Sequence, residues 1–144
     1  MTKIKFSSFR QLSFSAMLIF LVIAPKMSAQ DSVFLQKAMQ SCLDHQKVRP
    51  NLKAVTFADQ KNVLAVAKNR YTTEDIELTM FGQEAIIREK PDLFFYGIEN
   101  YVEVEEVQTE KDKIILTFMA DDHFTCSYSG KKGKVTKLTL AGSD

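Results

Sequence analysis

Four strand-like runs follow one another in the C-terminal half of the sequence, and this series constrains the fold more than any other feature. The runs are residues 101–109, 113–120, 124–129 and 134–140, and each is rich in β-branched, aromatic or other apolar side chains. Polar or Gly-containing segments of the kind found in tight turns separate them. Strands joined by tight turns pair with their neighbours, so the sequence predicts an antiparallel meander.

Side-chain alternation predicts how these strands lie in the sheet. In the run 124–129, aromatic and cysteine residues alternate with Ser and Thr, which is typical of a half-buried strand. The run 113–120 is apolar on both faces, so we expect it at the centre, with a helix over at least one face. In the first run, Val107 breaks the parity of the preceding valines, which predicts a β-bulge near Glu105 and Glu106.

An amphipathic helix is predicted upstream, from Ser32 to about Lys47. Pro50 disfavours helical geometry at the residue before it and ends the helix near there. The apolar residues of this segment recur at spacings of three and four, which places them on one helical stripe: Leu35, Ala38, Met39 and Cys42.

The middle of the chain gives shorter signals. The runs 55–57 and 63–67 flank a polar turn at residues 59–62 and predict a hairpin, although the second run also matches a helix capped by Asp59. Thr73–Phe81 is predicted to be a short helix that ends at Gly82.

Residues 91–98 predict a single helical turn, because Pro91 suits a first helical position. We expect this turn to place Leu93, Phe94 and Phe95 against the core. The alternative is that Phe94, Phe95, Tyr96 and Tyr101 line a pocket at the mouth of the curved sheet.

The predicted fold class is α+β: an N-terminal helix packed on a curved antiparallel sheet of four to six strands, with the C-terminal four-strand meander and a short second helix. In outline this architecture resembles cystatin-like and related helix-on-sheet folds. The resemblance rests on no diagnostic residue and implies no function.

Residues 1–29 have the composition of a cleavable secretory signal peptide. The first ten positions include basic residues and no acidic ones. An apolar run of about 13 residues follows, which is shorter than the run of about 20 residues that a membrane-spanning helix needs. Small residues before Gln30 offer a cleavage point after Ala29. We therefore expect export to a periplasm or the extracellular space, no stable membrane span after cleavage, and one small α+β domain at residues 30–144.

Charge argues against a nucleic-acid partner. The whole chain carries +1, and the leader holds four basic residues and no acidic ones, so the expected mature chain carries −3. A nucleic-acid-binding domain would show a strongly basic face.

The two cysteines, Cys42 and Cys126, are on the apolar faces of their predicted elements. In an oxidising compartment they are candidates for a disulfide between helix and sheet, which would restrict the unfolded chain by about 4 kcal/mol. The alternative is a pair of buried thiols that pack as small apolar residues.

Both histidines lie three positions from a cysteine, which raises a metal-site hypothesis with Cys42, His45, His123 and Cys126 as ligands. The spacing matches no standard zinc module, and an oxidised pair offers no thiolate. No metal or other cofactor is therefore assigned.

A catalytic alternative uses His123 as a general acid or base with Asp121 or Asp122, because histidine titrates near neutrality. Aspartates and histidines are also common in turns. The sequence contains no Gly-rich phosphate loop, nucleophile elbow or zinc-protease signature, so the common motif-bearing enzymes are disfavoured.

Two stretches of like charge accompany the strands. Acidic residues concentrate in the first run and basic residues at the last hairpin, the latter being Lys131, Lys132, Lys134 and Lys137. Both have the composition of solvated strand and turn surfaces, and the basic one also suits contact with an anionic surface.

The leading hypothesis is therefore an exported, non-enzymatic domain that binds a small apolar ligand or a protein partner through the concave face or an exposed edge of the sheet. The first alternative is a small acid/base enzyme that uses His123. The second is a structural or assembly component of the cell envelope that works by strand addition.

Overall fold

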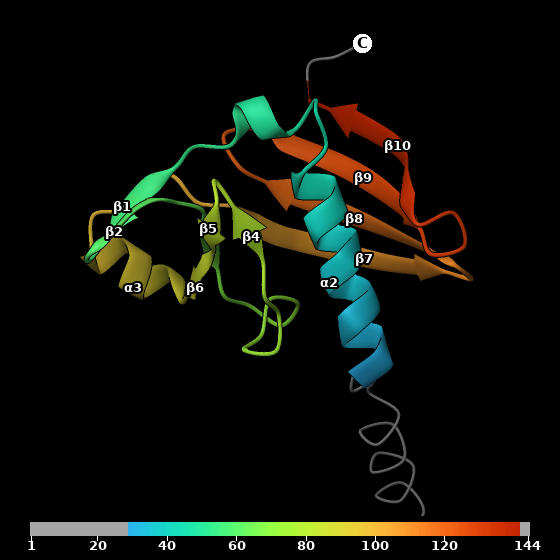
Figure 1. Ribbon diagram of the computed structural model, residues 1–144, viewed down its shortest axis with the longest axis horizontal. Coiled ribbons are helices and arrows are strands. Elements are labelled where there is room, and N and C mark those ends of the chain that lie inside the picture. Colours follow the sequence, from blue (N-terminus) through green and yellow to red (C-terminus); the bar gives the residue numbers. More distant parts are fainter. Residues whose placement is uncertain (1–28, 142–144) are drawn as a thin grey trace, which may run out of the picture.

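The computed structural model describes residues 29–141 as a sheet with a helix across it, joined to a smaller lobe (Figure 1). This is the α+β class that the sequence predicts. The predicted signal peptide lies outside the described residues except for its last residue, Ala29. In the part of the chain that the structure describes, no helix is long and apolar enough to cross a bilayer.

Two groups of elements make up most of the fold. The sheet body comprises α2 (Ala29–Leu43), β7 (Glu103–Glu110), β8 (Lys113–Met119), β9 (His123–Ser129) and β10 (Lys134–Leu140). The α3 lobe comprises β1 (Val55–Phe57), β2 (Gln60–Val63), β3 (Ala65–Ala67), β6 (Ile86–Arg88) and α3 (Lys90–Phe95). The connecting elements are a 3-10 turn, η1 (Arg49–Asn51), and the short strands β4 (Thr79–Met80) and β5 (Gln83–Glu84).

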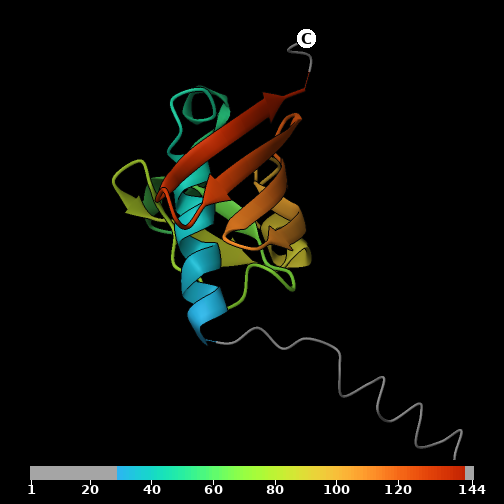
Figure 2. The same ribbon diagram turned by 90° about the vertical axis from the view of Figure 1, so that its right-hand side faces the viewer.

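The sheet body contains the predicted meander. Its strand order is β10-β9-β8-β7 with antiparallel pairing throughout, so β8 is central as its two apolar faces predict. The pairing of β7 with β8 shifts register between Val104 and Glu106, which confirms the predicted bulge. The edges of this sheet are β7 and β10, and β10 lies on the outside of the fold in the rotated view (Figure 2).

Helix α2 covers one face of the sheet and is bonded covalently to it. All four residues of the predicted stripe are buried beneath it, and Cys42 forms a disulfide with Cys126 of β9 across a Cα–Cα distance of 6.1 Å. The helix ends at Leu43, four residues before the predicted end, and the chain continues in turns. The Phe34 ring of this helix lies where a side chain at Gly130 would be, so a larger residue in the β9–β10 turn would have to displace this ring.

Strand β3 is buried on both faces and lies between the sheet body and the α3 lobe. Leu64 and Val66 belong to the main core with α2 and the sheet, whereas Ala65 and Ala67 belong to a second cluster with Leu93 and Ile98 near α3. This is the two-residue period of a strand. Strand β3 pairs in parallel with β6 and is joined to the start of β7 by a bridge between Val66 and Val102.

The predicted hairpin is present, but its second run is divided. Strands β1 and β2 pair antiparallel, and the turn is formed by Ala58 and Asp59 rather than by residues 59–62. Residues 60–62 extend β2, and a separate strand, β3, follows. The helical alternative for residues 63–67 is therefore wrong.

The predicted helix at Thr73–Phe81 is absent. Ile76, Leu78 and Met80 are buried while the residues between them are exposed, so the segment alternates like a strand. Two glutamine side chains of α2 hold it extended. The Gln36 carbonyl accepts the Glu77 N–H at 3.0 Å, and the Gln40 amide bonds both the N–H and the C=O of Thr79. Gly82 serves instead in the tight turn between β4 and β5, where its φ is +79°.

Candidate functional site

Helix α3 turns its largest side chains outward. Leu93 is buried against β3, but Phe94 is 83% and Phe95 82% exposed, and Tyr96 is 57% exposed. The expectation that Phe94 and Phe95 pack in the core is therefore wrong. A fully buried phenylalanine gains about 1.5–3 kcal/mol from its transfer out of water, and both rings forgo this gain. In Figure 1 the helix lies at the end of the molecule that is remote from α2.

Two of the exposed rings, those of Phe95 and Tyr96, form a row with an aromatic residue of the neighbouring hairpin. The Tyr96 ring lies 4.7 Å from that of Phe57 in β1 and 5.3 Å from that of Phe95, between ring centroids. Arg88 extends this row, with its guanidinium carbon 5.8 Å from the Phe57 centroid. We call Phe57, Phe94, Phe95 and Tyr96 the aromatic surface.

An apolar groove of about 430 Å³ borders the aromatic surface, and we call it the α3 groove. It is lined by Lys90, Pro91, Phe94, Ile98, Glu99 and Tyr101. Lys90 is held by an ion pair with Glu103 at 2.8 Å, and this hydrogen-bonded carboxylate raises the pKa of the Lys90 ammonium above its ordinary value. The groove thus combines an apolar floor with a fixed charge pair at its rim, an arrangement suited to an apolar side chain of a partner.

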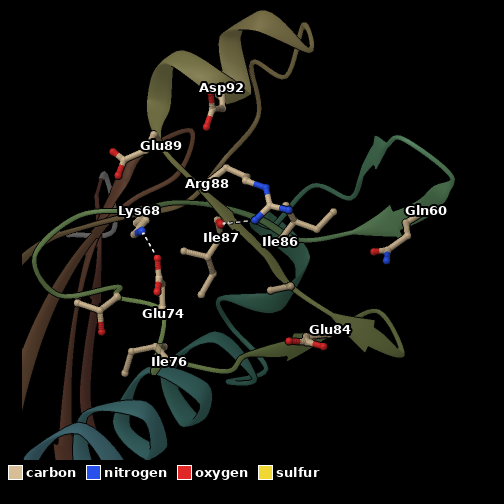
Figure 3. Close-up of a pocket in the computed structure, with 12 residues that line it drawn as sticks. Gln60, Lys68, Glu74, Ile76, Glu84, Ile86, Ile87, Arg88, Glu89 and Asp92 are labelled. Atoms are coloured by element: carbon tan, nitrogen blue, oxygen red, sulfur yellow. Dashed lines mark hydrogen bonds and ion pairs between the residues drawn. The ribbon is translucent and has the colours of Figure 1, made fainter.

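A second, polar groove of about 490 Å³ runs along β6 (Figure 3), and we call it the β6 groove. Four acidic and two basic side chains line it: Glu74, Glu84, Glu89, Asp92, Lys68 and Arg88. Lys68 and Glu74 form an ion pair at 2.9 Å, which raises the pKa of Lys68 and lowers the pKa of Glu74 through their shared hydrogen bond.

The floor of this groove is an edge of β6. The Ile86 N–H donates to the Leu64 carbonyl at 2.8 Å, and the Lys68 N–H donates to the Arg88 carbonyl at 2.7 Å. The backbone N–H and C=O groups of Ile86 and Arg88 therefore point toward β3. Because alternate residues of a strand direct their backbone groups to opposite sides, the N–H and C=O of Ile87 point away from β3. Arg88 belongs both to the β6 groove and to the edge of the aromatic surface, so the two are continuous.

The two cysteines of the metal-site hypothesis are bonded to each other. A disulfide offers no thiolate, so Cys42 and Cys126 are not ligands in this state. His45 lies in the turn after α2, where its Nδ1 accepts the Lys47 N–H at 3.2 Å. Within residues 29–141 no group of three His, Cys, Asp or Glu side chains is arranged to hold a metal ion.

The histidine of the catalytic hypothesis is on the outer face of the sheet. His123 is the first residue of β9, and its Nε2 is 2.9 Å from the Glu105 carboxylate, with more than half of its side chain exposed. Asp121 instead pairs with Lys53 at 2.6 Å. No groove described above contains His123, so the geometry does not build an enclosed acid/base site there.

The apolar face of the sheet is not open to a ligand either. Its side chains are buried beneath α2 and belong to the main core: Val104, Ile114, Leu116, Phe118, Phe124, Cys126 and Tyr128. In the described residues these side chains are therefore covered by α2, whereas the surfaces of the α3 lobe are exposed.

Sequence reasoning placed Phe94 and Phe95 in a helical turn but not on the surface. The signal that distinguishes them is helical phase: with Leu93 and Ile98 directed inward, the consecutive residues 94–96 have no room on the same side of so short a helix. No family model matches the sequence, no curated protein is significantly similar to it, and no solved structure matches the fold.

Proposed function

We propose that this chain is exported to an oxidising compartment and works there as a non-enzymatic domain that binds a protein partner through the aromatic surface. The observation that carries the proposal is the near-complete exposure of Phe94 and Phe95 on α3. Contiguous apolar side chains on a soluble surface are characteristic of interaction sites. Aromatic residues are also enriched where protein interfaces gain most of their energy.

The local charge favours a protein over an anionic membrane. Glu89, Asp92 and Glu99 surround α3 and are exposed, whereas Lys90 is already paired with Glu103. Arg88 is the basic residue left beside the aromatic surface, so acidic side chains outnumber unpaired basic ones there. Binding to anionic lipids relies on unpaired basic residues beside the apolar ones. The complementary partner therefore offers an apolar pocket for the phenylalanine rings and basic residues around it.

Export is supported by the disulfide and by the composition of the leader. Structural disulfides are typical of oxidising compartments such as the periplasm and the extracellular space. Intact-mass measurement of the protein purified from its native cells, with thiol alkylation before and after reduction, tests this part. We expect a chain that begins at Gln30 and takes up label at two thiols only after reduction. Labelling of both thiols in the unreduced native protein contradicts export to an oxidising compartment.

Site-specific photo-crosslinking in the native cells tests the binding surface. A photoreactive amino acid at Phe94 is expected to give one discrete protein adduct, identified by mass spectrometry. The matched control is the same amino acid at Lys37, an exposed position of α2. Equal adducts at both positions, or none at Phe94 in the exported protein, contradict the proposal. An adduct of lipid or small-molecule mass at Phe94 assigns the surface to an apolar ligand instead and overturns the protein partner.

A further inference from the structure

The two edges of the four-stranded sheet carry opposite charge. On β7, Glu106 and Glu110 are exposed, and on β10, Lys134 and Lys137 are exposed. None of these four side chains has an ion-pair partner within residues 29–141. Glu106 accepts a hydrogen bond from the neutral Gln108 amide at 2.8 Å, which leaves its charge unneutralised. The sheet therefore has an acidic edge and a basic edge.

Both charge sets lie on the same face of the sheet, the one turned away from α2. The pairings Glu106 with Thr117 and Glu110 with Lys113 place the two carboxylates there, opposite in direction to the buried Val104 and Leu116. On β10, Lys134 and Lys137 pair with Ser129 and Ser127, while the partly buried Val135 and Leu138 face the core.

The exposed part of each edge is a strand of ordinary length. The start of β7 is covered, because β3 bridges to Val102 and the Asn69 side-chain amide bonds the Val104 carbonyl at 2.8 Å. From Glu106 to Glu110 no described strand pairs with β7 on its outer side, and the same holds for β10 from Lys134 to Thr139. A run of five or six residues is enough to form a β-ladder.

We propose that these two edges bind each other between copies of this chain, with β7 of one copy added antiparallel to β10 of the next. The meander runs up and down in regular alternation, so a copy placed beside β10 in the same orientation presents β7 with the antiparallel direction that β10 requires. Such a contact is head-to-tail and leaves one acidic and one basic edge unpaired at the ends. Association therefore continues beyond a dimer.

One register satisfies both faces of this contact. With Glu110 opposite Lys134 and the existing irregularity of β10 retained between Val135 and Lys137, Val107 lies opposite Leu138. Glu106 is then diagonal to Lys137, within the reach of long side chains. Unlike charges thus face each other on the outer side, and apolar side chains meet on the core side.

The same charges exclude the two symmetric alternatives. Pairing of β7 with β7 brings carboxylates together, and pairing of β10 with β10 brings ammonium groups together, both of which are destabilising. Charged edge strands commonly prevent aggregation in this way. Here each edge repels its own kind, and only the unlike pair is attractive, which selects a single mode of assembly.

Sedimentation velocity on the purified, disulfide-bonded protein tests the inference. We expect the average mass to rise with concentration past that of a dimer. Raising the salt from about 0.01 M to about 1 M, which shortens the screening length from about 30 Å to 3 Å, is expected to reduce association at least tenfold. A monomer under all conditions, or a series that stops at a dimer, overturns the proposal.

Charge exchange gives the decisive comparison. The variants E106K/E110K and K134E/K137E are each expected to be monomeric, because their two edges carry the same charge, and an equimolar mixture is expected to associate again. The control K37E/K47E makes the same change of net charge as K134E/K137E at two exposed positions outside the sheet, and it is expected to associate like the unchanged protein. Association of either edge variant alone, or failure of the mixture to associate while both variants unfold like the unchanged protein, overturns the edge contact.

Discussion

The strands of the sheet body have seven or eight residues each, whereas no strand of the α3 lobe exceeds four. The sheet body buries a large core beneath α2 and is joined across it by a disulfide. The second cluster, at α3, is made of four buried residues, two of which are alanines: Ala65, Ala67, Leu93 and Ile98.

The exposure of aromatic side chains is distributed in the opposite way. The stacked rings of Phe118 and Phe124 in the sheet body are buried, while Phe94 and Phe95 in the α3 lobe are almost fully solvated. The sheet body thus supplies the stability, and the α3 lobe presents apolar surface that contributes little to it. On the proposed function the binding surface lies outside the main core, so that surface can change without loss of the fold.

The largest expected effect concerns the bond across the sheet body. The double variant Cys42→Ala/Cys126→Ala removes the covalent link between two residues that are 84 positions apart in the sequence. Because this link restricts the unfolded chain, we expect its loss to lower the free energy of unfolding by about 4 kcal/mol. Denaturant unfolding followed by circular dichroism measures this. A loss below about 1 kcal/mol would mean that the core beneath α2 stabilises the sheet body without the bond.

A smaller and local loss of stability is expected at β3, which lies between the sheet body and the α3 lobe. Ala67→Leu inserts a large side chain against Leu93 and costs about 1–3 kcal/mol. Hydrogen exchange is expected to show lower protection at the β3 and α3 amides and unchanged protection in β8. Ala54→Leu, at an exposed position, is the control. Equal loss of protection in β8 would show that the lobe and the sheet body unfold as one unit.

The smallest expected effect is electrostatic and confined to the β6 groove. Glu74→Gln removes the hydrogen-bonded carboxylate, so the pKa of Lys68 is expected to fall toward its ordinary value. Because the pKa of Glu74 is lowered in the folded protein, its stabilising contribution is present above its unfolded pKa and is lost as pH falls through the folded pKa.

An NMR titration of the Lys68 side chain measures this effect, with Glu77→Gln as the control. The Lys68 pKa is expected to be unchanged in the control. The same Lys68 pKa in Glu74→Gln and in the unchanged protein would contradict the ion pair.

Sequence patterns predicted the sheet body better than the rest of the fold, and the reason is length. Long strands and a four-turn helix repeat their period often enough to identify both the element and its buried face, as the placement of Cys42 and Cys126 shows. The sequence leaves the disulfide and a pair of buried thiols as alternatives, because the faces on which two cysteines lie do not give the distance between them.

Residues 73–81 show what the sequence contained and what it did not. The alternation of Ile76, Leu78 and Met80 was a signal for an extended segment, but the acidic start and Gly82 favoured a helix. The glutamine contacts from α2 that hold the segment extended involve partners about 40 residues away, and no local pattern reveals them. The exposure of Phe94 and Phe95 was missed because apolar residues are core residues in most proteins.

Two neighbouring residues of α3 test the division between stability and recognition most directly. The free energy of unfolding of Leu93→Ala and Phe95→Ser is measured together with the yield of the photo-crosslink from position 94. We expect Leu93→Ala to lose about 2–5 kcal/mol. Phe95→Ser is expected to lose less than about 1 kcal/mol and to abolish the crosslink. A Phe95→Ser variant that is as destabilised as Leu93→Ala, or that keeps the full crosslink, contradicts this account.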